Sequence, residues 1–264
     1  MKRSFPQRRP LLFVALLLLV IVITYFLAGA ITIQLKLSSG VTALMADGVL
    51  TLIAIFLLTR YQWWRDIGLR LPSHPRSLWL FALPCLPIIV NIAFFGLGNP
   101  GIGGLLLFLV AALFVGFAEE TFFRGMILRV LLRRGAWQAV IISSLVFGIM
   151  HLLDVAGGAN LVATLLDVVY AVSIGLMYAA LALRTQTILP LIVTHGLTNF
   201  FVFIALNATI VTTGLSTLFY VVSAGETILF TAYSLLLLRQ RKPQVFEAEK
   251  GTTFVPPVTH EELV

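Results

Sequence analysis

Long apolar runs, separated by short segments that carry most of the basic residues, dominate the sequence. Of its 264 residues, 59% are hydrophobic and only 11% are charged, a composition outside the range of soluble globular domains. Runs of about 20 apolar residues are long enough to cross a bilayer as α-helices. We therefore expect an all-α fold, a polytopic transmembrane helical bundle. A single cysteine, Cys85, excludes an intramolecular disulfide and a cysteine-rich metal site.

Eight such runs can be placed along the chain, so we expect about eight spans. Pro84 and Pro87 should kink the third run, and the fourth should project beyond the bilayer because it continues into the basic residues 129–134 before Gly135 ends it. The approximate bounds of the runs are 11–30, 41–59, 78–97, 105–134, 137–153, 161–183, 188–206 and 211–238.

The runs and the segments between them suggest a division of the chain into five parts. Ala28-Gly29-Ala30 resembles a signal-peptidase site, but the apolar run before it is longer than an ordinary signal sequence, so we expect an uncleaved anchor. The five parts are a basic N-terminus in 1–10, three helices in 11–104 with an aromatic and basic interfacial segment near 60–77, a core of helices four to seven in 105–207, an eighth helix in 208–240, and a disordered tail in 241–264.

The basic residues indicate the orientation in the membrane. When the loops are assigned alternately to two sides, one side takes nearly all Lys and Arg, and the other has Lys36 alone. By the positive-inside rule, both termini are cytoplasmic, in a multi-pass protein of the cell membrane whose partner is the lipid bilayer. The same distribution accounts for the net charge of +7 without nucleic acid as a partner.

Two adjacent carboxylates, Glu119 and Glu120, and Arg124 lie inside the fourth apolar run. An ionised side chain at membrane depth costs at least a few kcal/mol and is usually kept for function. On a helix, Glu120 and Arg124 share a face and can pair, which leaves Glu119 as the free carboxylate. The second glutamate adds like-charge repulsion, so the site can hold a proton or activate water. The alternative is a buried ion pair that only locks helices together.

Two of the four histidines, His151 and His195, also lie inside predicted spans. Phe147 precedes His151 by four residues, and Asn199 follows His195 by four, so each pair shares a helical face. Glu119 and His151 are both 16 residues from Gly135, about 24 Å along a helix, and should face each other at one level. His195 reaches this level if spans four and five begin outside the bilayer.

Three motifs therefore occur in order on helices: Glu-Glu-x-x-x-Arg at 119–124, Phe-x-x-x-His at 147–151 and His-x-x-x-Asn at 195–199. Together they resemble the CPBP family of intramembrane proteases, which groups the CAAX prenyl endopeptidases with Abi-like bacterial relatives linked to bacteriocin maturation and self-immunity. The resemblance covers about residues 105–206. It implies an endopeptidase that hydrolyses a peptide bond in a membrane-associated protein or peptide.

The resemblance also implies a role for each motif residue. Glu119 and His151 would activate a water molecule that attacks the scissile carbonyl, and His195 and Asn199 would stabilise the oxyanion. The supporting residues would be Glu120, Arg124 and Phe147.

Metal dependence stays open, because members of the family have been described both as metalloproteases and as glutamate proteases. Glu119, His151 and His195 could bind zinc, but no His-Glu-x-x-His pair supports this. No cofactor is therefore certain, with a divalent metal such as zinc as the one candidate.

Two other functions remain as alternatives. Asp47, Asp167 and Glu226 lie at membrane depth outside the motifs, without a partner that the sequence identifies, and they favour a proton-coupled transporter. Such a transporter should have repeat symmetry and matched helix breaks, which the sequence lacks. The second alternative is a non-catalytic membrane immunity or scaffold protein. The basic, anchor-like N-terminus looks bacterial, where prenylated CAAX substrates are not expected.

Overall fold

A computed structural model describes residues 5–37, 39–156, 158–206 and 217–239. Every regular element in these ranges is helical, which confirms the all-α class. The α-helices are α1 (Phe5–Arg8), α2 (Pro10–Leu35), α3 (Ser39–Tyr61), α4 (Leu86–Phe95), α5 (Gly101–Glu120), α6 (Leu128–Leu131), α7 (Ala136–Met150), α8 (Leu153–Ala156), α9 (Leu161–Thr185), α10 (Leu189–Leu206) and α11 (Thr217–Arg239). The other helical segments are the 3₁₀-helices η1 (Pro75–Phe81), η2 (Leu83–Cys85) and η4 (Leu132–Arg134) and the π-helix η3 (Thr121–Ile127).

The polytopic membrane bundle is confirmed, although length and composition support fewer spans than the eight predicted. Within the described ranges, six helical segments are long and apolar enough to cross a membrane. The pair Pro75–Phe81 and Leu83–Phe95 adds a seventh if it is one span, bent by 43° in the region of Pro84 as predicted. α10 is apolar but shorter. The six are Pro10–Leu35, Leu44–Tyr61, Gly101–Arg134, Ala136–Val155, Leu161–Thr185 and Tyr220–Arg239.

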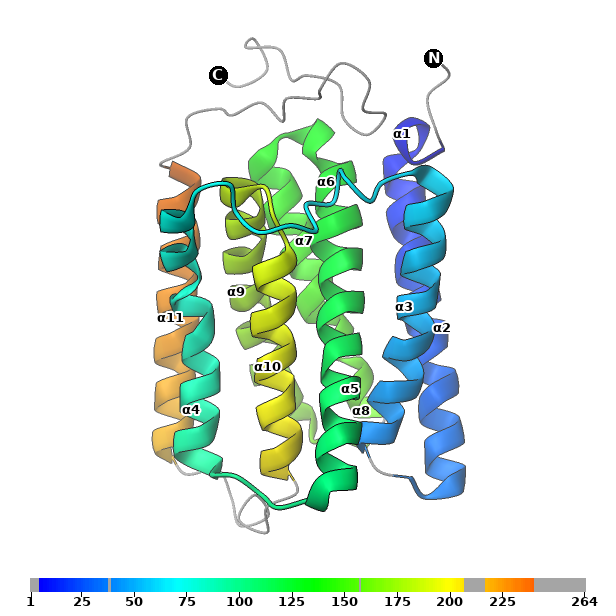
Figure 1. The fold of residues 1–264 in the computed structure, drawn as a ribbon, viewed down its shortest axis with the longest axis vertical. Helices are drawn as coiled ribbons and strands as arrows, with labels where there is room; N and C mark the ends of the chain where they lie inside the picture. The colour runs from blue at the N-terminus through cyan, green and yellow to red at the C-terminus, as the bar shows by residue number, and fades with distance from the viewer. Residues whose placement is uncertain (1–4, 38, 157, 207–216, 240–264) are drawn as a thin grey trace.

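The long helices run side by side along one axis (Figure 1). α5 packs between α3 and α10, and α2 packs on the other side of α3. α7 packs on α9, and α9 packs on α11. α7 and α9 lie behind α5 and α10 in Figure 1 and form a second layer. α5, η3, α6 and η4 follow one another without a break from Gly101 to Arg134, so this stretch joins the two ends of the bundle.

Small residues allow the helices around α5 and α9 to approach closely. A Cβ atom at Gly116 of α5 would lie 2.5 Å from the backbone oxygen of Ile192 in α10, and one at Gly196 would lie 3.1 Å from the oxygen of Ala112. On α7, a Cβ atom at Gly148 would lie 2.9 Å from the backbone oxygen of Val168 in α9. These contacts hold α5 against α10 and α7 against α9 at the depth of the three motifs.

Gly116→Ala is therefore expected to destabilise the bundle by about 1–3 kcal/mol, the usual cost of overpacking, because the new methyl group meets backbone rather than a movable side chain. Thermal unfolding in detergent measures this. Gly103→Ala on the same helix is the control, because a Cβ atom at Gly103 meets nothing within 4 Å. Equal midpoints for the two variants would contradict the close approach of α5 and α10.

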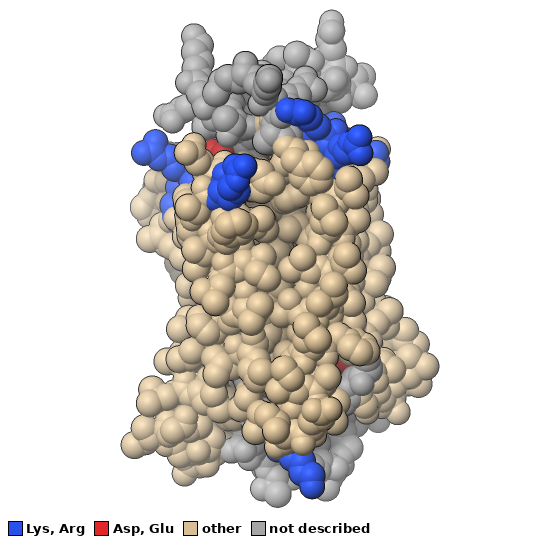
Figure 2. All heavy atoms as spheres, turned by 90° about the vertical axis from the view of Figure 1, so that its right-hand side faces the viewer, with Lys and Arg blue, Asp and Glu red and all other residues tan. Residues whose placement is uncertain are grey.

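The basic side chains gather mainly at one end of the molecule (Figure 2). The start of α2 and the end of α11 lie at this end (Figure 1), whereas Lys36 caps α2 at the opposite end. The segregation of charge agrees with the alternation predicted from the sequence, but the assignment of this end to the cytoplasm stays a prediction. The predicted tail in 241–264 and the start of the predicted eighth span lie outside the described residues.

Reporter fusions test the orientation. Fusions after Arg76, Arg134 and Arg184 are expected to report the cytoplasm, because these residues belong to the positive side of the sequence. Fusions after Lys36 and Pro100 should report the outside. Opposite signals at two or more of these sites would overturn the predicted orientation of both termini.

Candidate active site

Glu119 and Glu120 end α5, immediately before the π-helix η3. π-helical turns are rare and are frequent at functional sites. Arg124 lies within η3, and its Nη1 donates to Oε1 of Glu120 over 2.9 Å. The side chains of Glu120 and Arg124 are 0% and 1% exposed. The predicted pair is therefore present and fully buried.

The same oxygen of Glu120 accepts a second hydrogen bond, from Nδ1 of His195 over 2.8 Å. Because Glu120 is ion-paired with Arg124 and a carboxylate accepts hydrogen bonds without donating them, we assign a proton to Nδ1 of His195. Glu120 thereby fixes both the tautomer and the ring orientation of His195. The other ring nitrogen, Nε2, then faces Glu119 at 3.5 Å from Oε2.

Glu119 is less buried than Glu120, with 19% of its side chain exposed. It has no arginine partner, as predicted, but it is not isolated, because the Tyr25 hydroxyl lies 3.4 Å from its Oε1 and His195 approaches its other oxygen. When His195 is neutral and carries its proton on Nδ1, its Nε2 is a hydrogen-bond acceptor, and so is an ionised Glu119 carboxylate. One added proton, on either Nε2 or the carboxylate, allows a hydrogen bond between the two groups. The pair is therefore suited to exchanging a proton.

An aromatic shell surrounds Arg124. The guanidinium carbon lies 4.2 Å from the ring centroid of Phe147 and 5.4 Å from that of Tyr178. Nε and Nη2 of Arg124 are buried without an acceptor, so these cation–π contacts supply interactions that hydrogen bonds do not. The ring of Phe147 also lies against both imidazoles, 5.2 Å from His151 and 6.1 Å from His195.

His151 follows directly after α7, and its Nδ1 donates to the backbone oxygen of Phe147 over 3.1 Å. Among the described residues, no contact joins His151 to Glu119. Asn199 lies on the face of α10 that carries His195, as predicted, and its Nδ2 donates to the backbone oxygen of His195 over 3.2 Å. The amide keeps one N–H for another acceptor.

The helices α2 and α3 also contribute to this cluster, which the sequence motifs do not indicate. The Tyr25 hydroxyl of α2 contacts both carboxylate oxygens of Asp47 of α3, at 2.9 and 3.0 Å, next to Glu119. The sequence indicates that Asp47 is a carboxylate at membrane depth, but nothing in it selects Tyr25 as the partner. Glu226 likewise has a tyrosine partner, the hydroxyl of Tyr170 at 3.2 Å.

The three candidate zinc ligands do not fit a metal site in this arrangement. Among the described residues, no group of three His, Cys, Asp or Glu side chains is placed to hold a metal ion. Glu119 and Nε2 of His195 lie close together, but His151 contacts neither of them.

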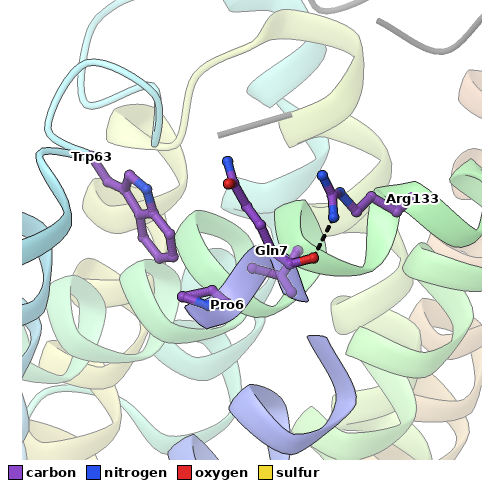
Figure 3. A pocket seen from close by; sticks show the side chains of 5 residues that line it. Pro6, Gln7, Trp63 and Arg133 are labelled. Atoms are coloured by element: carbon purple, nitrogen blue, oxygen red, sulfur yellow. Dashed lines mark hydrogen bonds between the residues drawn. The ribbon is translucent and has the colours of Figure 1, made fainter. Parts of the chain in front are cut away.

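A small recess lies apart from this cluster, near the basic end of the bundle (Figure 3). Arg133 donates there to the backbone oxygen of Gln7, which ties α1 to η4. None of the residues that line it belongs to the three motifs. They are Pro6, Gln7, Trp63, Val130 and Arg133.

Comparison with known proteins supports the resemblance found in the motifs. A comparison with curated proteins found no match. Residues 101–201 match a family model described as type II CAAX prenyl endopeptidase Rce1-like. The match covers α5 to most of α10 and includes all three motifs, whereas α2, α3 and α11 lie outside it. The predicted resemblance is thus confirmed over residues 101–201, where the match to the Rce1-like family model supports a CPBP intramembrane protease.

Proposed function

We propose that this protein is an endopeptidase that hydrolyses a peptide bond in a membrane-associated protein or peptide, with Glu119 and His151 activating the water. The observation that carries this proposal is the division of labour between the two glutamates. Glu120 is sealed between Arg124 and His195, while Glu119 keeps a partly exposed carboxylate beside a histidine nitrogen. One carboxylate is structural, and the other is available for proton transfer.

The proposed reaction follows from the proton positions. Glu119 or His151 accepts a proton from water, and the water oxygen attacks the scissile carbonyl. The negative charge that develops on the carbonyl oxygen is stabilised by the protonated Nε2 of His195 and the remaining N–H of Asn199. When the tetrahedral intermediate collapses, the scissile C–N bond breaks and the abstracted proton passes to the leaving amine. Phe147, which packs against Arg124 and both imidazoles, keeps the rings in place.

A prenylated peptide is the first substrate to test, because the matching family is described as a prenyl endopeptidase. The purified protein, reconstituted in liposomes, is expected to cleave a quenched fluorescent peptide that ends in S-farnesyl-cysteine and three further residues. A comparison of the membrane proteome of a Glu119→Ala strain with its parent extends the search to other substrates. If the parent cleaves no prenyl peptide and the two proteomes have the same processed ends, the proposed function is wrong.

Asn199→Ala is expected to lower kcat about 10²–10³-fold with little change in KM, since a donor that acts in the transition state contributes to rate rather than to substrate binding. Steady-state kinetics on the same peptide measure this. Thr198→Ala is the control, because Thr198 also donates to its own helix, over 2.9 Å to the oxygen of Thr194. A loss of the same size in both variants would show that helix integrity, and not the amide donor, determines the rate.

A further inference from the structure

A polar bridge from the N-terminal helices reaches Glu119 from outside the residues that match the family. The Tyr25 hydroxyl lies between Asp47, at 2.9 and 3.0 Å from its two oxygens, and Oε1 of Glu119 at 3.4 Å. Tyr25 belongs to α2, Asp47 to α3 and Glu119 to α5. Three helices therefore meet at one hydroxyl group.

The Asp47 carboxylate in this bridge is fully buried, which costs free energy. Asp47 is 0% exposed, and in the described part of the chain it makes no ion pair with Lys, Arg or His. A carboxylate at membrane depth is expensive and marks a functional site unless it is paired. Among the described residues, Tyr25 alone hydrogen-bonds the Asp47 side chain, and the same hydroxyl connects Asp47 to Glu119.

The packing of α2, α3 and α5 keeps the three bridge residues next to one another. Asp47 is followed by Gly48, where a Cβ atom would lie 3.4 Å from the ring of Phe114 of α5, so α3 approaches α5 closely beside the bridge. α2 packs on α3 in turn. A tyrosine hydroxyl has one proton, so Tyr25 can donate to only one carboxylate at a time while its oxygen remains beside the other.

We propose that Tyr25 and Asp47 are positioning residues for Glu119. Asp47 holds the Tyr25 hydroxyl, and the hydroxyl fixes Oε1 of Glu119 so that Oε2 faces His195. The N-terminal hairpin of α2 and α3 thus completes a site whose other residues come from the Rce1-like domain. This inference rests on the proposed function, in which Glu119 is the base.

The test of positioning is kinetic. Tyr25→Phe, which removes only the hydroxyl, is expected to lower kcat on the farnesyl peptide by about 10- to 100-fold with KM within about twofold, as for a misplaced catalytic group. Asp47→Leu should match this loss, and Asp47→Asn, which still offers an acceptor, should lose less. The double variant Tyr25→Phe/Asp47→Leu should be no slower than either single variant, because both act through one bridge.

Tyr170→Phe is the matched control, because Tyr170 also bonds a buried carboxylate, Glu226, but on α9 and α11. It should retain the kcat of the parent. An equal loss in Tyr170→Phe, an unchanged kcat in Tyr25→Phe, or multiplying losses in the double variant would overturn the inference. If Tyr25→Phe does not accumulate in the membrane, Asp47→Asn and Asp47→Leu are compared instead. A smaller loss of kcat in Asp47→Asn supports the inference, and equal losses overturn it.

A second measurement does not depend on proteolysis. Dicyclohexylcarbodiimide modifies carboxyl groups in apolar surroundings, and peptide mass analysis gives the rate at Glu119. Tyr25→Phe should raise that rate several-fold, because the hydroxyl no longer engages Oε1, while Tyr170→Phe should leave it unchanged. If the parent cleaves no substrate, the proposed function is wrong, but the modification rate still tests the bridge. An unchanged rate at Glu119 in Tyr25→Phe would show that the Tyr25 hydroxyl does not engage Glu119.

Discussion

Glu119→Gln is expected to reduce cleavage by about 10²–10⁴-fold, the range that general acid–base groups contribute, while abundance in the membrane stays at the parent value. The substitution is isosteric and removes the ability to take a proton. It should not unfold the protein, because Glu119 has no arginine partner and the glutamine amide keeps an oxygen that can still accept from the Tyr25 hydroxyl. Steady-state kinetics and quantitative immunoblotting measure both quantities.

Glu226→Gln is the matched control, since it also replaces a buried carboxylate bonded to a tyrosine. It should retain the activity of the parent. The alternatives predict different results for Glu119→Gln: a purely structural ion pair at Glu120 and Arg124 predicts no change, and a proton-coupled transporter predicts altered pH-driven uptake in vesicles with every membrane polypeptide intact. Full proteolytic activity in Glu119→Gln would contradict the mechanism.

Interactions within one helix were predictable from the sequence. The Glu120–Arg124 pair, the stacking of Phe147 on His151 and the shared face of His195 and Asn199 all join residues four apart. The helix breaks were also predictable, since Gly135 has φ +97° at the end of η4 and the prolines fall in the bent third segment. Local geometry determines all of these features.

Interactions between helices were less predictable, because they depend on how each helix is rotated. The π-helix η3 adds backbone that a 3.6-residue period does not contain, so the faces of residues 121–127 shift relative to α5. Counting residues from Gly135 placed Glu119 opposite His151, whereas the structure places His195 against both glutamates. The bridge from Tyr25 to Asp47 could not be predicted, since it depends on the packing of α2 and α3 against α5.

Arg124→Ala is expected to lower the free energy of unfolding by about 3–5 kcal/mol, because it leaves Glu120 as a buried charge without its cation. Glu120 is 0% exposed, and its Oε2 has no hydrogen-bond partner, so the carboxylate depends on Arg124 and His195 at Oε1. The loss of a guanidinium 4.2 Å from Phe147 adds to the cost. Abundance in the membrane and the midpoint of thermal unfolding in detergent measure the effect.

Two further variants separate charge from packing. Arg124→Lys keeps the charge but not the planar group that stacks on Phe147, so its stability should fall between those of Arg124→Ala and the parent.

The double variant Glu120→Gln/Arg124→Met replaces the ion pair by neutral groups and should recover most of the stability that Arg124→Ala loses, because neutral replacements of buried ion pairs are often no less stable than the pair. It should still cleave slowly, because His195 then faces an uncharged amide in place of the carboxylate that fixes its tautomer. If Arg124→Ala were as stable as the parent, Glu120 would have to be neutral, and the assignment of the His195 proton to Nδ1 would lose its basis.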